Sequence, residues 1–241
     1  MMINVYADGA DYNGIIEAAK NPFIKGFTTN PTLMRQAGVT DYEAFVRKIL
    51  PELKALRPET NISLEVFADD YDNMYRQAKI IDAWGKEYDY TVYVKIPVMN
   101  TQGEYNYKLI QDLTNEGVKV NVTAIFTAEQ SLDVLQSINT NTTDVIISIF
   151  AGRIADTSID PLDIITESMW HCTRTNTQFL WASCREVYNY MQAAAAGCDI
   201  ITMTPDQIKK LTSLMHKNLD EYSRETVQMF FNDAQKSGYN I

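Results

Sequence analysis

Short runs rich in β-branched and aromatic residues recur along the chain and predict eight strands. The runs are Ile3–Ala7, Gly26–Thr29, Ile62–Val66, Thr91–Ile96, Lys119–Thr123, Asp144–Ile149, Gln178–Ser183 and Asp199–Met203. Each is followed by a longer stretch in which apolar residues recur at helical spacing, as in 42–50 and 74–84. Strands that alternate with helices in this way predict a parallel sheet.

The spacing of the runs favours a closed (β/α)₈ barrel. Successive strand ends lie 20 to 37 residues apart, which leaves room for a strand, a crossover helix and two loops. Eight such units fill the 241 residues of the chain, close to the ~250 typical of a barrel. The alternative is an open, doubly wound sheet, but no glycine-rich dinucleotide or P-loop motif follows any run. Dinucleotide and P-loop nucleotide binding are therefore disfavoured.

The segment from Pro205 to about Lys236 predicts one or two further helices. Its apolar positions are Leu211, Leu214, Leu219, Tyr222, Val227, Phe230 and Phe231, which make a longer face than a barrel needs. Two interpretations stay open: a last barrel helix with a lid on the same subunit, or a helix that packs on a neighbouring subunit. No Gly-, Pro- or Ser-rich linker divides the chain, so we expect one domain over 1–241, with a helical extension at about 205–237.

Composition narrows the classes of partner. The chain has 21 basic and 31 acidic residues, a formal net charge of −10, so its long-range field repels polyanions. We therefore expect no nucleic-acid partner and no membrane partner. The N-terminus lacks a signal peptide and no apolar run approaches membrane-spanning length, which predicts a soluble, cytoplasmic protein.

The cysteines and histidines indicate neither a disulfide framework nor a metal site. Cys172, Cys184 and Cys198 are odd in number and have no C-x-x-C spacing, so we interpret them as small hydrophobic residues. His171 and His216 lack the spacing of metal ligands. No metal and no cofactor are expected.

Polar side chains at every second position, which share one face of a strand, recur near the C-terminal ends of the runs. Barrel enzymes assemble their active sites at these ends. The side chains are Asn4, Tyr6 and Asp8 in the first run, Ser63 and Glu65 in the third, Lys95 in the fourth, Asn121 and Thr123 in the fifth, Ser148 and Phe150 in the sixth, and Trp181 and Ser183 in the seventh, with Asn30 just past the second. Together they predict a polar site at that end of the barrel.

Lys95, in the run TVYVKIPV, carries the most chemistry. An ammonium among β-branched residues is costly to desolvate, and a lysine whose pKa burial lowers is an amine nucleophile for carbonyl groups. The alternative is a lysine on an edge strand, turned to solvent, which Pro97 would suit. A closed barrel has no edge, so the site interpretation is favoured.

Other residues near the strand ends suit the chemistry of a lysine imine. Glu65 could relay protons to and from the carbinolamine through a water held by Thr123, and Asp8 could act as a second base where a C–C bond breaks. Arg153 and Arg185 could clamp a phosphate together with Ser183. Each has an ordinary alternative: a helix N-cap for Asp8, strand propensity for Thr123, a solvated surface for the arginines.

Six segments in order resemble the transaldolase family, and more closely its short-chain branch, which also contains fructose-6-phosphate aldolase. They are FTTNPTLM (27–34), SLEV (63–66), VYVKIP (92–97), VNVTAIF (120–126), ISIFAGRI (147–154) and WASCRE (181–186). The resemblance implies a metal-free class I (β/α)₈ enzyme that moves a dihydroxyacetone unit between sugar phosphates through a lysine imine. It also implies a homo-oligomer built through the C-terminal helix. Small-molecule sugar phosphates are then the expected partners.

Carried over by position, the resemblance assigns roles to individual residues. It makes Lys95 the imine-forming residue and Asp8 the acid/base, with Glu65 and Thr123 holding a proton-relay water. The expected substrate-binding residues are Asn30, Asn121 and Ser148 for hydroxyls, Arg153, Ser183 and Arg185 for phosphate, and Thr28 and Phe150 in addition. Gly9 stands where the family more usually has threonine.

Two positions bear on which branch the chain follows. The resemblance implies that fructose-6-phosphate aldolase has glutamine and tyrosine at the positions where this chain has Glu65 and Phe150. A phenylalanine cannot pass a proton, so the enamine should wait for an aldehyde acceptor, which predicts a transaldolase of the pentose phosphate pathway. The alternatives are an aldolase that releases free dihydroxyacetone and a non-catalytic barrel that binds sugar phosphates.

Overall fold

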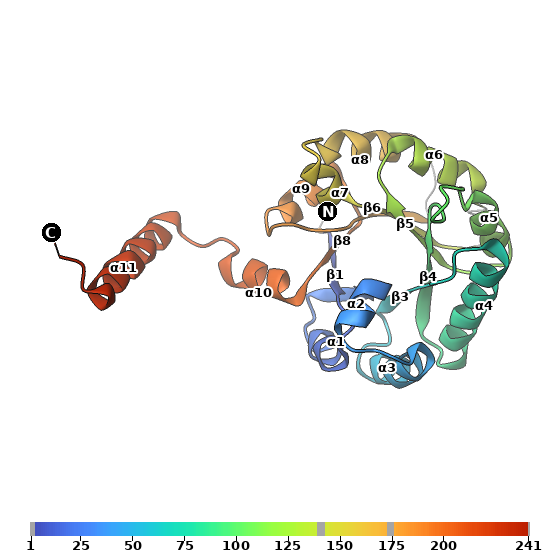
Figure 1. The fold of residues 1–241 in the computed structure, drawn as a ribbon, viewed down its shortest axis with the longest axis horizontal. Coiled ribbons are helices and arrows are strands. Elements are labelled where there is room, and N and C mark those ends of the chain that lie inside the picture. The colour runs from blue at the N-terminus through green and yellow to red at the C-terminus, as the bar shows by residue number, and fades with distance from the viewer. Residues whose placement is uncertain (1–2, 139–142, 173–175, 241) are drawn as a thin grey trace.

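The computed structural model describes residues 3–138, 143–172 and 176–240. Within them eight parallel strands pair in sequence order and close into a barrel (Figure 1). The strands are β1 (Asn4–Asp8), β2 (Ile24–Thr28), β3 (Asn61–Glu65), β4 (Thr91–Pro97), β5 (Val120–Ile125), β6 (Val145–Ile149), β7 (Thr177–Trp181) and β8 (Ile200–Met203). Because β1 pairs with both β2 and β8, the closed barrel is confirmed and the open sheet is wrong.

Most of the helices in the described residues surround the barrel on its outer side, and α11 lies apart from it (Figure 1). They are α1 (Tyr12–Ala19), α2 (Pro31–Gln36), α3 (Tyr42–Leu56), α4 (Tyr71–Glu87), α5 (Tyr107–Asn115), α6 (Ala128–Ser137), α7 (Ala151–Asp156), α8 (Pro161–Trp170), α9 (Asn189–Ala196), α10 (Pro205–Leu214) and α11 (Leu219–Ser237). Several begin at a side chain that accepts from the first turn, and Thr127 and Thr204 form full capping boxes.

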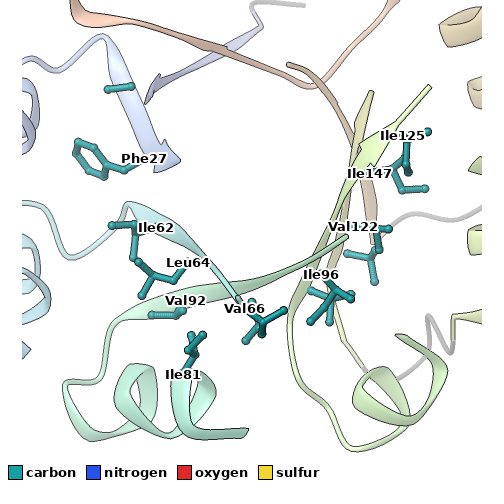
Figure 2. Packing of buried hydrophobic residues seen from close by; sticks show 14 of the residues in the cluster. Phe27, Ile62, Leu64, Val66, Ile81, Val92, Ile96, Val122, Ile125 and Ile147 are labelled. Atoms are coloured by element: carbon teal, nitrogen blue, oxygen red, sulfur yellow. The ribbon is translucent and has the colours of Figure 1, made fainter. Parts of the chain in front are cut away.

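The apolar core has two parts. The larger lies between the strands and the helices, where Ile81 of α4 faces Val92 of β4 and Val66, which follows the end of β3 (Figure 2). A smaller cluster fills the barrel interior; it consists of Tyr6, Tyr93, Ile146, Leu180, Ala182 and Ile200. In α4, Ile80 is 38% exposed, so it stands at the margin of the apolar face that the spacing predicts. The C-terminal ends of the strands are left to polar residues.

The two C-terminal helices behave differently. α10 follows β8 and buries Ile208 and Leu211. α11 extends away from the barrel and has no buried residue (Figure 1). A lid on the same subunit is therefore not what α11 forms. No helix in the described parts of the chain is long and apolar enough to cross a membrane.

Candidate active site

A pocket of about 200 Å³ lies at the C-terminal ends of the strands, and its size suits a small ligand. Eleven of the twelve predicted site residues line it: Asp8, Thr28, Asn30, Lys95, Asn121, Thr123, Ser148, Phe150, Arg153, Ser183 and Arg185. The twelfth, Glu65, contacts Lys95. The barrel thus brings together residues that come from seven of the eight strand–helix units.

Lys95 is the cation at the base of this pocket. It is 6% exposed, and its Nζ lies 3.0 Å from Oε2 of Glu65 and donates to the carbonyl of Thr29 at 2.8 Å. Glu65 and Lys95 are direct partners in the register of β3 and β4, which explains the pairing. A solvent-facing edge lysine is therefore wrong. The ammonium must lose a proton before it can attack a carbonyl, and Glu65 is within reach to accept it.

The end of β5 is shaped by an irregularity. Ala124 has a φ of 60°, and the register with β6 shifts between Val122 and Ile125. Such a bulge turns the neighbouring side chain away from its regular direction. Thr123 lines the pocket, and its buried Oγ1 has no hydrogen-bond partner within the described residues. A hydroxyl is thus available to a ligand on the side of the pocket next to Lys95.

Asp8 supplies a second carboxyl group from β1. Thr28 donates to its Oδ1 at 2.7 Å. Burial raises the pKa of Asp8, while the Thr28 hydrogen bond and the charge of Lys95 oppose the rise. The N-cap interpretation of Asp8 is wrong, because Asp11 caps α1 by accepting from Gly14 N at 2.6 Å. Asp8 is therefore free for acid/base chemistry.

A hydrogen-bonded row of side chains crosses three strands. Ser148 Oγ donates to Asn121 Oδ1 at 2.7 Å, and Asn121 Nδ2 donates to Ser63 Oγ at 3.0 Å. The row fixes the orientation of the Asn121 amide at the wall of the pocket. Asn30 has a divided role, because its Oδ1 caps α2 by accepting from Leu33 N at 2.9 Å.

The loop after β7 and the start of α7 meet very closely. A Cβ added at Gly152 would lie 1.6 Å from the carbonyl oxygen of Ser183, so only glycine permits the approach. Ser183 itself has a φ of 63°. This contact places Ser183 and Arg153 at the same rim of the pocket. A strained turn of this kind is typical of a functional site.

Two arginines stand at this rim with defined partners. The guanidinium of Arg185 makes an ion pair with Asp156 at 2.5 Å, with both side chains about half exposed. The guanidinium of Arg153 lies over the Phe150 ring, 5.3 Å from its centroid. Both cations are held in place and keep donors for an anion. The rim therefore suits the phosphate of a small ligand.

The predicted parity of the seventh strand needs correction. Leu180 lines the pocket, whereas Trp181 belongs to the outer core cluster. β7 ends at Trp181, and Ser183 reaches the pocket through its left-handed backbone rather than by strand alternation. Ser183 is correctly predicted as a pocket residue, but the reason from alternation is wrong.

Sequence reasoning missed six further residues that line the pocket: Leu180, Ala182, Cys184, Thr202, Thr204 and Gln207. Gln207 accepts from Thr204 N at 3.0 Å and donates to the Cys184 carbonyl at 3.1 Å, which ties the start of α10 to the loop after β7. Burial raises the pKa of the Cys184 thiol, so this thiol is not activated as a nucleophile. Thr202 is a polar residue in an otherwise apolar eighth strand, and this pattern could have indicated it from the sequence.

Potential metal ligands do not gather in the described parts of the chain: no group of three or more His, Cys, Asp or Glu side chains there could hold an ion. Cys184 and Cys198 are free thiols.

Comparison with known proteins adds independent findings. The family model described as Transaldolase/Fructose-6-phosphate aldolase matches residues 5–241. A probable transaldolase of Hyphomonas neptunium is 32% identical over 242 residues, which cover 98% of this chain and 99% of that protein. A probable transaldolase of Dehalococcoides mccartyi is 32% identical over 203 residues, covering 83% and 86%.

A solved structure of a mutant tryptophan synthase α-subunit from Pyrococcus furiosus is also similar. It has a TM-score of 0.59 at 11% identity, and the match covers 94% of this chain and 96% of that one. At this identity the likeness bears on the fold alone.

Proposed function

The chain belongs to the transaldolase/fructose-6-phosphate aldolase family, and from this premise we propose that it is a transaldolase. It would transfer a dihydroxyacetone unit from sedoheptulose 7-phosphate to glyceraldehyde 3-phosphate, giving erythrose 4-phosphate and fructose 6-phosphate in the pentose phosphate pathway. The observation that carries the proposal is the buried Lys95, which lies 3.0 Å from Glu65 and lines one pocket with Asp8 and two arginines.

The first stage is imine formation on Lys95. Glu65 takes a proton from the ammonium, and the neutral amine attacks the ketose carbonyl to give a carbinolamine. Glu65 then returns a proton to the carbinolamine hydroxyl, which leaves as water while the protonated imine forms. The free hydroxyl of Thr123 lines the same pocket and can hold the water through which these protons pass.

The second stage breaks and makes a carbon–carbon bond. Asp8 removes the proton from the hydroxyl on the fourth carbon, the bond between the third and fourth carbons breaks, and its electron pair moves to the imine to form an enamine. The shortened aldose phosphate leaves. The enamine then attacks the incoming aldehyde, whose oxygen takes the proton back from Asp8, and hydrolysis of the imine frees the new ketose phosphate. The raised pKa of Asp8 makes it a stronger base than an ordinary aspartate.

Substrate binding divides between the wall and the rim of the pocket. Asn121, Ser148 and Asn30 would bind the hydroxyls of the dihydroxyacetone unit, while Arg153, Ser183 and Arg185 would hold the phosphate. The pre-existing partners of these side chains support the assignment, because groups already held in place lose little freedom when a ligand binds.

Phe150 favours transfer over release of free dihydroxyacetone. Its ring packs against Phe126 with a centroid distance of 5.7 Å and lines the pocket. An aromatic ring without a hydroxyl gives the enamine no proton, and protonation is the step that would end the reaction as an aldolase. The enamine therefore persists until an aldehyde acceptor arrives.

The test combines trapping with a transfer assay. Fructose 6-phosphate and borohydride should label the peptide that contains Lys95, and the substitution of Lys86, an exposed lysine, by methionine should leave the labelling unchanged. Erythrose 4-phosphate as acceptor should raise turnover of fructose 6-phosphate far above the rate at which free dihydroxyacetone appears. Release of dihydroxyacetone at a rate that matches transfer would indicate the aldolase, and absence of an adduct would indicate a non-catalytic barrel.

We also propose that the protein is a homo-oligomer that assembles through α11. The support is the exposed apolar set on this helix: Leu219, Tyr222, Val227, Met229, Phe230 and Phe231. A helix without a buried residue gains little from its own barrel, and a large exposed apolar patch is typical of a protein interface. The cytoplasmic location and the absence of nucleic-acid, membrane and cofactor partners stay predictions from composition and resemblance.

A further inference from the structure

Behind Asp8, two threonine hydroxyls continue the hydrogen bonding across the barrel wall. Thr28 Oγ1 lies 2.7 Å from Asp8 Oδ1 and 2.5 Å from Thr202 Oγ1. The three residues come from three adjacent strands, because β1 lies between β2 and β8. Thr28 is 3% exposed and Thr202 is 6% exposed. The two hydroxyls are thus largely withdrawn from solvent.

The direction of the hydrogen bonds follows from the number of protons. A carboxylate only accepts, so Thr28 gives its single hydroxyl proton to Asp8. The contact between the two threonines then requires Thr202 to donate to Thr28. Hydrogen bonds in such a row polarise one another, and each strengthens the next. The row therefore runs from Thr202 through Thr28 to Oδ1 of Asp8.

We propose, on the basis of the function proposed above, that Thr202 is a positioning residue for the transfer reaction. By donating to Thr28 it fixes the Thr28 proton on Oδ1 of Asp8, so that Oδ2 is the oxygen that exchanges protons with the substrate. Oδ2 accepts no hydrogen bond from the described residues, and this leaves it available.

Removal of the Thr202 hydroxyl has a predictable consequence. The lone pair of Thr28 that accepts from Thr202 would be buried without a donor, and the hydrogen bond from Thr28 to Asp8 would no longer be polarised by Thr202. A weaker hydrogen bond opposes the effect of burial less, so the pKa of Asp8 would rise further. The charges of Lys95 and Glu65 also act on the Asp8 carboxyl group, and the charge of Asp8 acts on the Cys184 thiol. A substitution at Thr202 leaves all of these groups in place.

The experiment compares Thr202→Val, which keeps the shape and loses the hydroxyl, with Thr202→Ser, which keeps the hydroxyl. Thr202→Val should lower kcat about tenfold, as expected for a hydrogen bond that strengthens one to a charged group, and should leave KM unchanged. The acid limb of the pH profile should move to higher pH, and Thr202→Ser should restore it. Thr60→Val is the matched control, because Thr60 is a buried threonine bonded to Tyr90 and lines no part of this pocket.

A double variant separates action through Thr28 from direct contact with the substrate. If Thr202 acts through Thr28, Thr202→Val should have no further effect on turnover in a Thr28→Val background. An equal loss in both backgrounds, or a wild-type pH profile in Thr202→Val, would overturn the proposal. Should the valine variant not fold, Thr202→Ala takes its place in the same comparison.

Two readouts keep this proposal distinct from the function on which it rests. Borohydride trapping on Lys95 reports imine formation, which does not need Asp8, so Thr202→Val should trap as the wild type does. An NMR titration of labelled aspartate follows Asp8 without any substrate, and Thr202→Val should raise its midpoint. A missing adduct in the wild type counts against the transaldolase, whereas an unchanged Asp8 midpoint counts against the role of Thr202.

Discussion

Two regions depart from the ordinary distribution of side chains: the mouth of the barrel, which is the pocket at the C-terminal ends of the strands, buries polar groups, and α11 exposes apolar groups. At the mouth, charged and polar groups are buried: Lys95 is 6% exposed and Thr28 is 3% exposed. On α11, large apolar groups face outward: Phe230 is 62% exposed and Phe231 is 58% exposed. Burial of a polar group is costly unless the group has a partner, and a large exposed apolar surface is typical of a site that another surface covers.

The contrast in partners is equally clear. Several polar groups of the mouth are bonded to other strands, as Lys95 is to Glu65 and Asn121 is to Ser63 and Ser148, whereas the buried hydroxyl of Thr123 has no partner within the described residues. The polar contacts of α11 lie within the helix, as when Thr226 donates to the Tyr222 carbonyl, or join it to the residues just before it, as in the ion pair of Glu225 with Lys217. A defect at the mouth should therefore damage catalysis, and a defect in α11 should damage assembly.

Substitution of Lys95 should have the largest effect. Lys95→Met removes the amine that forms the imine, so transfer should fall by at least about 10³-fold in a coupled assay. The same change leaves Glu65 without its cation, and the double variant with Glu65→Gln should recover the melting temperature but not the activity. Residual turnover near the wild-type rate would contradict the role of Lys95.

Asp8→Asn should come next, with kcat reduced by about 10²–10⁴-fold as for loss of a general base. Its effect on stability has a definite sign. The folded protein holds the Asp8 proton more tightly than the unfolded chain does, so the stability of the wild type falls as pH rises from about 3.9 through the raised pKa.

Thermal melts between pH 4 and pH 8 check this sign. Asp8→Asn should gain stability relative to the wild type as pH rises through that window, and the gain should vanish at its acid end. An identical pH dependence in the two proteins would mean that burial does not raise the pKa of Asp8.

Arg185→Ala should have an intermediate effect, on the binding of phosphorylated donors. Loss of hydrogen bonds to a charged group costs about 1.5–3 kcal/mol, so KM for phosphorylated donors should rise roughly 10- to 150-fold. Reaction with unphosphorylated dihydroxyacetone donors should change little, and Arg76→Ala on α4 serves as the control. Equal losses on both classes of donor would contradict the phosphate role. Asp156→Asn, which only frees Arg185, should change KM less than Arg185→Ala does.

Truncation after Lys217 should have the smallest effect on the barrel, because α11 buries none of its residues. The turnover number per active site should be retained, while the mass measured by light scattering should fall. Phe230→Ser combined with Phe231→Ser should reproduce the fall, and Gln228→Ser on the same helix should not. An unchanged mass after truncation would overturn assembly through α11.

The fold could be predicted from the sequence because the period of apolar residues is a local property. All eight strands form where the runs predict them, with ends displaced by at most two residues. The ends shift because hydrogen bonding to neighbours decides them, as at β7, where the left-handed backbone of Ser183 follows the end of the strand. Helix α4 shows the same limit, since Ile80 fits the spacing yet stands partly exposed.

Most residues that line the pocket could be predicted from the sequence, but the contacts among them could not. Alternation and the family motifs indicate which residues lie at the strand ends, and eleven of twelve predicted residues line the pocket. The register of strands distant in sequence determines that Thr28 reaches Thr202, and the chain separates them by 174 residues. The three-dimensional structure is likewise needed to see the cap that Asn30 makes on α2 and the close approach of Gly152 to Ser183.

The closure of β1 against β8 also bears on how the protein is made. A ribosome releases β1 first and β8 about 200 residues later, a delay of roughly 10–40 s at 5–20 residues per second. Throughout that time one edge of β1 in the nascent chain has no strand beside it and is open to pairing with another chain. Thr202 reaches Thr28, and through it Asp8, only when β8 pairs with β1, so the onset of enzyme activity during synthesis would report the final strand pairing.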